Sequence, residues 1–98
     1  MIRLDQIEGF EWDDGNSRKS VLKHGQGEVE QVFVNEPLLI LEDMIHSTVE
    51  PRFHAFGKTF EDRFLQVSFT LRDSGKRIRV ISARPMSRKE RARYGQES

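Results

Sequence analysis

The sequence contains no cysteine among its 98 residues, which excludes a disulfide scaffold, a thiolate nucleophile and any zinc site built on cysteine. It also lacks a long hydrophobic run, because the longest, Leu38–Leu41, is far shorter than the roughly 20 residues of a membrane-spanning helix. No basic and then apolar leader opens the chain, so we expect a cytoplasmic protein with no membrane contact. A chain of this length supports one domain over residues 1–98, with a core of modest size.

A net charge is also missing, since 16 Lys and Arg balance 16 Asp and Glu. The two halves of the chain differ sharply, however. Residues 1–50 contain 4 basic and 11 acidic side chains, whereas residues 51–98 contain 12 basic and 5 acidic ones. This asymmetry favours a polyanionic partner for the C-terminal part, although a solvated basic surface without a partner would give the same count.

Two helices are expected in the first part of the chain. Asp13 or Asp14 can cap the first helix, and Gly25 is typical of the position just after a helix C-terminus, so the helix is expected to end there. Apolar residues at helical spacing predict a second helix over residues 28–34. The segment Asn35–Pro37 breaks it.

Most of the remaining segments alternate apolar and polar residues with a period of two, which is typical of half-buried strands, whereas Leu38–Leu41 is a short apolar run that is typical of a buried strand. The expected strands cover residues 7–12, 38–41, 52–57, 64–71 and 77–84. A turn at Asp73–Gly75 joins the last two as an antiparallel hairpin, and the capping-box spacing of Ser87 and Glu90 predicts a final helix that ends near Gly95. The order of elements predicts an α+β fold, a small antiparallel sheet with two N-terminal helices and a short C-terminal helix.

Arg84 stands at the end of the last expected strand. A period of two places it on the face of Ile78 and Val80, opposite the face of Arg77 and Arg79. Arg84 is therefore either a partly buried structural arginine or one directed into a cleft. The planar guanidinium donates two parallel hydrogen bonds to phosphate, so we favour a phosphate-binding role.

The final helix is polar almost all round, which is more typical of a binding or bridging surface than of a core element. Its Arg88 and Arg91 are candidate contacts for a polyanion. Tyr94 lies one turn after Glu90 and could stack on a base or donate a proton, but it could equally pack the helix onto the core. Glu90 is interpreted as the capping-box partner.

Histidines are candidates for proton transfer near neutral pH. His24 lies beside Lys23 and soon after Lys19, at the expected end of the first helix, where it is either an acid–base group or a simple helix cap.

His54 shares a strand face with Arg52, and Glu50 precedes them. These three residues are either an acid–base set or an exposed strand edge. The histidines lack the spacing of a metal site, so we expect neither a metal nor a cofactor.

Several short segments stand together in the order of one known family. They are Phe10–Asp13, Lys23–Gly25, Val32–Phe33, Asn35–Pro37, Glu50–Phe53, Arg77–Arg84, Arg88–Arg91 and Tyr94. The chain resembles a BrnT-type toxin of the type II toxin–antitoxin systems over about residues 9–95. It departs from the family pattern at Asn16, where a lysine is usual, and in a short connection after Gly25.

The resemblance implies a fold similar to RelE-type and barnase-like ribonucleases and an endoribonuclease activity that cleaves mRNA and inhibits growth. It also implies a BrnA-like antitoxin with a ribbon-helix-helix DNA-binding part, which neutralises the toxin in a heterotetramer and supplies the only contact with DNA.

Together these observations predict metal-independent RNA cleavage, in which the 2′-hydroxyl attacks the adjacent phosphorus. The candidate catalytic residues are Arg84, Arg52, His24, His54, Glu50 and Tyr94. The candidate RNA-binding residues are Lys23, Lys19, Arg79, Arg77, Arg88 and Arg91. A non-catalytic nucleic-acid-binding module and a protein-interaction domain remain the alternatives.

Overall fold

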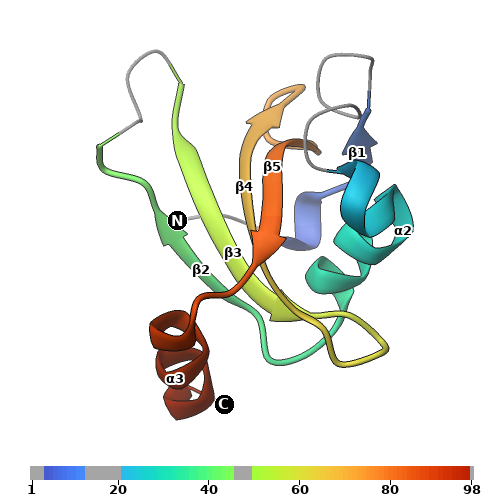
Figure 1. The fold of residues 1–98 in the computed structure, drawn as a ribbon. Helices are drawn as coiled ribbons and strands as arrows, with labels where there is room; N and C mark the ends of the chain where they lie inside the picture. Colours follow the sequence, from blue (N-terminus) through green and yellow to red (C-terminus); the bar gives the residue numbers. More distant parts are fainter. Residues whose placement is uncertain (1–3, 13–20, 46–49, 98) are drawn as a thin grey trace.

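A computed structural model describes residues 4–12, 21–45 and 50–97, and in these ranges the chain forms a five-stranded sheet with two α-helices (Figure 1). The strand order is β1-β5-β4-β3-β2. The elements are a 3-10 helix η1 (Leu4–Gln6), β1 (Gly9–Glu11), α2 (Val21–Val34), β2 (Leu39–Glu42), β3 (Arg52–Lys58), β4 (Phe64–Arg72), β5 (Arg77–Pro85) and α3 (Arg88–Glu97).

The α+β class is confirmed, and β2 to β5 form the expected antiparallel array. The expectation of a purely antiparallel sheet is wrong at one edge, because β1 pairs with β5 in parallel, with Gly9 opposite Arg77 and Phe10 opposite Ile78. The chain crosses the sheet through α2 between β1 and β2, so β1 and β2 lie on opposite edges (Figure 1). The sheet is therefore mixed.

The expectation of two N-terminal helices is also wrong, because α2 is a single helix that continues through Gly25 to Val34. A glycine inside a helix costs only about 1 kcal/mol relative to alanine. Complete burial of Val29 and Val32 against the sheet is worth more than that, so Gly25 does not end the helix. The chain accordingly has no connection after Gly25, whereas Asp13, Asp14 and Asn16 lie outside the described residues.

The core lies between α2 and one face of the sheet. Four aromatic rings form a continuous series in this layer: Phe10 meets Phe33 edge to face, Phe33 meets Phe69 in the same way, and Phe69 stacks on Phe53. Trp12 Nε1 donates a hydrogen bond of 2.7 Å to a carboxylate of α2. The face of the sheet that α2 covers is therefore closed by apolar packing.

The predicted capping box starts α3. The Glu90 amide donates to Ser87 Oγ over 3.1 Å, and the Ser87 amide donates to Glu90 Oε1 over 2.8 Å. Tyr94 is 4% exposed, packs edge to face on Phe64 and donates its hydroxyl hydrogen to the Pro37 carbonyl. These contacts hold α3 at one end of the sheet, apart from α2 (Figure 1).

Candidate functional site

The face of the sheet opposite α2 carries most of the polar strand residues, and we call it the polar face. Strand pairing aligns its side chains in three rows that run across β3, β4 and β5. The rows are Arg52, Thr70 and Arg79; His54, Ser68 and Ser82; and Phe56, Gln66 and Arg84. Two arginines therefore lie on one side of the histidine row and Arg84 on the other, so this face combines cations with a titratable group.

Arg84 reaches the polar face because β5 contains a β-bulge. Ser68 pairs with Ser82, but the next residue of β4, Phe69, pairs with Val80, so Ile81 is an extra residue in β5. An extra residue reverses the alternation of side chains beyond it. The expectation that Arg84 shares a face with Val80 is therefore wrong, and Arg84 lies on the same face as Arg79.

His54 is held by partners on both ring nitrogens. Its Nε2 lies 3.0 Å from Asp43 Oδ2, and the Asp43 side chain is 7% exposed. Its Nδ1 lies 2.8 Å from Ser68 Oγ and 2.6 Å from Gln66 Nε2. Asp43 itself is fixed, because its Oδ1 accepts the Ile45 amide over 3.1 Å. The imidazole is therefore oriented by a buried carboxylate.

These contacts define the tautomer of neutral His54. A carboxylate only accepts hydrogen bonds, so Nε2 carries the proton and Nδ1 presents a lone pair. Ser68 and Gln66 both face that lone pair, and only one can donate to it at a time. Nδ1 is thus the basic atom of the ring.

Arg84 forms a two-point ion pair with Glu90 of α3. Nη1 donates to Oε1 and Nη2 to Oε2, each over 2.8 Å, and Nη1 also donates to the Pro85 carbonyl over 3.1 Å. These hydrogen bonds lower the pKa of Glu90 from 4.5 to about 2 and raise the pKa of Arg84. Both groups therefore stay charged at neutral pH.

The ion pair uses only one edge of the guanidinium. Arginine has five N–H donors, and the edge formed by Nε and Nη2 points away from an acceptor bound at Nη1 and Nη2. Within the described part of the chain, the Nε–H of Arg84 has no acceptor. Glu90 thus orients Arg84 and leaves a second edge for a phosphate.

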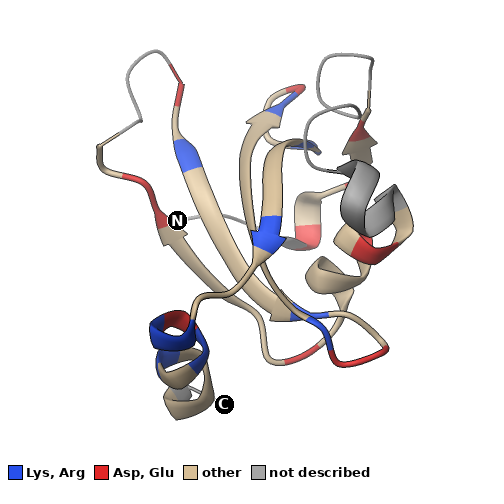
Figure 2. Ribbon diagram, viewed as in Figure 1, with Lys and Arg blue, Asp and Glu red and all other residues tan. Residues whose placement is uncertain are grey.

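Other predicted cations are partly engaged with the protein. Arg79 Nη1 contacts Glu11 Oε1 of β1 over 2.9 Å, and Arg77 donates to the Phe10 carbonyl over 3.1 Å. Arg52 is half-buried at the start of β3, across from Thr70. In Figure 2, the ribbon is coloured for Lys and Arg along α3, at the end of β5 and at the start of β3.

The structure does not bring Glu50 or Tyr94 into the polar face. Glu50 is exposed and pairs with Arg72 over 3.3 Å. Burial raises the pKa of Tyr94, and its hydroxyl is bound to Pro37, which gives Tyr94 an anchoring position in α3. On the same helix, the Arg91 guanidinium lies 4.8 Å from the Phe64 ring centroid.

Arg88 is an exposed residue of the first turn of α3. Lys19 lies outside the described residues, and the structure describes the helical backbone of Lys23 and His24 without their side chains.

Sequence reasoning missed Asp43, Ser68 and Gln66. Ser68 and Gln66 occupy the polar positions of β4, so the alternation marks their face, but only the register with β3 shows that they meet His54. Asp43 follows the apolar run of β2, and nothing in its local sequence distinguishes it from a solvated loop residue. Its burial becomes visible only when the pairing of β2 with β3 is known.

No group of three or more metal-binding side chains occurs among the described residues. Within the same ranges, neither helix has the length and hydropathy required to cross a bilayer.

A comparison with families of known proteins identifies a match over most of the chain. The profile of that family, described as the ribonuclease toxin BrnT of a type II toxin–antitoxin system, covers residues 12–90. A search of curated proteins found no match. The matched segment includes all three rows of the polar face, Asp43 and the Arg84–Glu90 ion pair. Because the match covers well over half of the sequence, the chain belongs to the BrnT family of ribonuclease toxins.

Proposed function

We propose that the chain is an endoribonuclease that cleaves mRNA on the polar face without a metal ion and thereby inhibits translation and growth. One observation carries the proposal: His54, oriented by the buried Asp43, lies between the row of Arg52 and the row of Arg84. This arrangement offers a base and several cations on one face, which are the groups that cleavage by an internal hydroxyl requires.

In the proposed reaction, Nδ1 of His54 accepts the proton of a ribose 2′-hydroxyl. The 2′-oxygen then forms a bond to the adjacent phosphorus, and the bond from phosphorus to the 5′-oxygen breaks. The leaving oxygen takes a proton from water, which gives a 2′,3′-cyclic phosphate and a 5′-hydroxyl. The free edge of Arg84 binds a phosphate oxygen whose negative charge increases in the transition state, and Arg52 supports it from the opposite row.

The remaining candidates take other positions in this proposal. Arg79 and Arg77 line the path of the RNA backbone next to Arg52, and Arg88 and Arg91 extend the positive surface along α3. Tyr94 anchors α3 and leaves proton transfer to His54.

A type II family implies a protein antitoxin as partner. We propose a BrnA-like antitoxin with a ribbon-helix-helix part that binds DNA, in a heterotetramer with the toxin. In this proposal, an acidic segment of the antitoxin binds the positively charged surface of β5 and α3 (Figure 2).

Cleavage of a defined oligoribonucleotide in EDTA tests the catalytic proposal. We expect a 2′,3′-cyclic phosphate product, and no cleavage when the scissile nucleotide is 2′-deoxy. His54→Ala is expected to lower kcat by about 10²- to 10⁴-fold. Asp43→Asn, which leaves the imidazole in place without its orienting carboxylate, is expected to lower kcat while RNA binding is retained.

Arg84 provides a second measurement in the same assay. Arg84→Ala is expected to lower kcat about 10²- to 10³-fold, and Arg84→Lys, which keeps the charge but not the fork, is expected to restore it only in part. Lys76→Ala is the matched control, because Lys76 lies in the exposed turn between β4 and β5. Salt-sensitive RNA binding without any cleavage would instead identify a non-catalytic binding module.

A further inference from the structure

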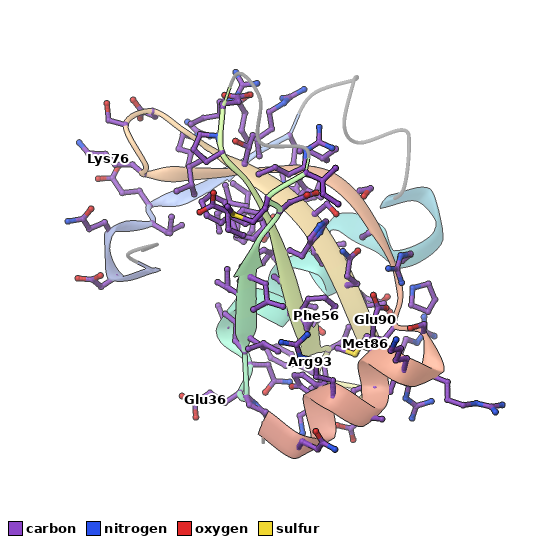
Figure 3. All side chains as sticks on the ribbon, turned by 90° about the vertical axis from the view of Figure 1, so that its left-hand side faces the viewer. Glu36, Phe56, Lys76, Met86, Glu90 and Arg93 are labelled. Atoms are coloured by element: carbon purple, nitrogen blue, oxygen red, sulfur yellow. The ribbon has the colours of Figure 1, made fainter. Side chains whose placement is uncertain are left out.

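A groove lies where α3 meets the polar face. Its floor is apolar and is formed by Leu39, Leu41 and Phe56, and its α3 side is formed by Lys89, Arg93 and Gln96. Its volume is about 520 Å³, which is within the range of small-molecule sites. We call it the α3 groove. In Figure 3, Phe56 and Arg93 lie beside each other where the helix approaches β3.

The α3 groove is adjacent to the candidate catalytic site. Phe56 pairs across the sheet with Gln66, which in turn pairs with Arg84. Phe56 is also two residues from His54 along β3, a rise of about 7 Å, and on the same face. Whatever binds at His54 and Arg84 therefore has the groove as its immediate neighbour.

Phe56 differs from the other phenylalanines in its surroundings. Five phenylalanine rings make ring–ring contacts in the core or beneath α3; they are Phe10, Phe33, Phe53, Phe64 and Phe69. Phe60 is 65% exposed in the turn between β3 and β4. Phe56 is half-buried in the groove floor and makes no ring–ring contact with the described residues. A flat ring is thus presented to the groove.

The charges around the groove suit a nucleic-acid strand. Within the described ranges, Lys89 and Arg93 form no ion pair, and the nearby carboxylate of Glu90 is taken by Arg84 and Ser87. Cations beside an aromatic ring are the combination with which proteins bind single-stranded nucleic acids, the ring for the base and the cations for the phosphates.

We propose that the α3 groove binds a nucleobase of the RNA next to the cleaved bond, stacked on Phe56, with Lys89 and Arg93 at the flanking phosphates. This inference rests on the proposed function for its substrate class. It adds the site at which the enzyme discriminates the nucleotide beside the scissile phosphate.

Binding of a non-cleavable oligoribonucleotide, with 2′-O-methyl groups throughout, tests the proposal separately from catalysis. The oligonucleotide is compared with versions that lack one base at each position in turn. One abasic position is expected to weaken binding to the unmodified protein by about 5- to 100-fold. With Phe56→Leu, which keeps an apolar floor but removes the flat ring, affinity is expected to be low already, and the same abasic change is expected to have little further effect.

Phe60→Leu is the matched control and should leave the full abasic effect unchanged. Thermal unfolding of each variant verifies that it is folded. Equal abasic effects in Phe56→Leu and the unmodified protein would overturn the proposal, even if the RNA is cleaved. If the abasic effect on affinity disappears in Phe56→Leu but the unmodified protein cleaves no RNA, the result would support the binding site and contradict the proposed catalysis.

An acidic protein segment is the competing occupant of the groove. A Glu- and Leu-containing peptide supplies the probe. If Phe56→Leu weakened binding of this peptide while RNA binding stayed unchanged, the groove would belong to a protein partner and the proposal would be wrong.

Discussion

Glu90 accepts hydrogen bonds from two elements, the Ser87 amide at the start of α3 and both Nη atoms of Arg84 in β5. One carboxylate thereby caps a helix and fixes the plane of a guanidinium. The capping role follows from sequence spacing alone. The second role requires the end of β5 to lie next to the start of α3, with Arg84 turned toward it.

This double role predicts a specific dependence of stability on pH. The pKa of Glu90 in the folded state is about 2, below its usual 4.5, so its contribution to stability is complete above pH 4.5 and is lost as the pH falls toward 2. Glu90→Gln keeps an oxygen for the Ser87 amide but loses the charge. We expect the variant to be less stable than the parent protein at pH 6 and nearly equal at pH 2.

Urea unfolding across this range measures the difference between the two proteins. Glu61→Gln, which changes an exposed carboxylate of the turn between β3 and β4, is the control and should unfold in parallel with the parent at every pH. A difference between Glu90→Gln and the parent that stays constant with pH would contradict a contribution of the ionised Glu90 carboxylate to stability.

At the residue scale, the sequence predicts chemistry better than it predicts contacts. The arginines and His54 are visible as candidates because their side chains carry the chemistry. Asp43 is not, because a carboxylate after a short apolar run is usually solvated, and its burial depends on a hydrogen-bond partner 11 positions later in the chain.

At the scale of single elements, the boundaries of β3, β4 and β5 follow closely from alternation, but the faces of their side chains do not. The bulge at Ile81 leaves the apolar composition of β5 unchanged and reverses every side chain after it. A strict period of two treats Ile81 as a regular strand residue and therefore places Arg84 and Arg79 on opposite faces of β5. Only strand pairing shows that the two arginines share a face.

The contact between α2 and β3 has a sharp steric requirement. A Cβ at Gly57 would lie 2.9 Å from Val32 Cγ1 and 3.1 Å from the Val32 carbonyl oxygen. Gly57→Ala is therefore expected to lower the free energy of unfolding by about 1–3 kcal/mol, as in other overpacked cores.

Gly27→Ala is the matched control within the same pair of elements. Gly27 lies in α2, and an added Cβ would meet nothing within 4 Å. This substitution is expected to raise the free energy of unfolding by roughly 0.5–1 kcal/mol. Thermal and urea unfolding measure both variants, and equal effects of the two substitutions would contradict the close contact between Gly57 and Val32.

At the scale of the whole molecule, the sequence predicts the α+β class but not the mixed sheet. Both edge strands are short, and a run of three residues, Gly9–Glu11, contains no signal for the direction of its partner. The parallel pairing of β1 depends on where α2 carries the chain. That path is set by packing of Val29 and Val32 on a sheet that forms mainly from later residues.

The segregated charge predicts the salt dependence of RNA binding. In a plot of the logarithm of affinity against the logarithm of salt concentration, each phosphate contacted on a single strand contributes about −0.7 to the slope. Three or four contacts therefore give a slope of about −2 to −3. Arg52→Ala is expected to reduce the magnitude of the slope by about 0.7, and Lys76→Ala, in the exposed turn between β4 and β5, is expected to leave it unchanged.

Fluorescence anisotropy of a labelled oligoribonucleotide at several KCl concentrations gives these slopes. A slope near zero for the unmodified protein would contradict an electrostatic role of the polar face.

The parallel pairing of β1 with β5 also has a consequence for the order in which the fold is completed during synthesis. Gly9 and Glu11 pair with Arg77 and Arg79, so the sheet remains open at this edge until residues 77–79 have left the ribosome. Arg84 and Glu90 emerge later still. A nascent chain that has not yet reached Glu90 therefore lacks the oriented arginine, and one that has not reached residues 77–79 also lacks the closed sheet, so the complete polar face forms only after Glu90 has been translated.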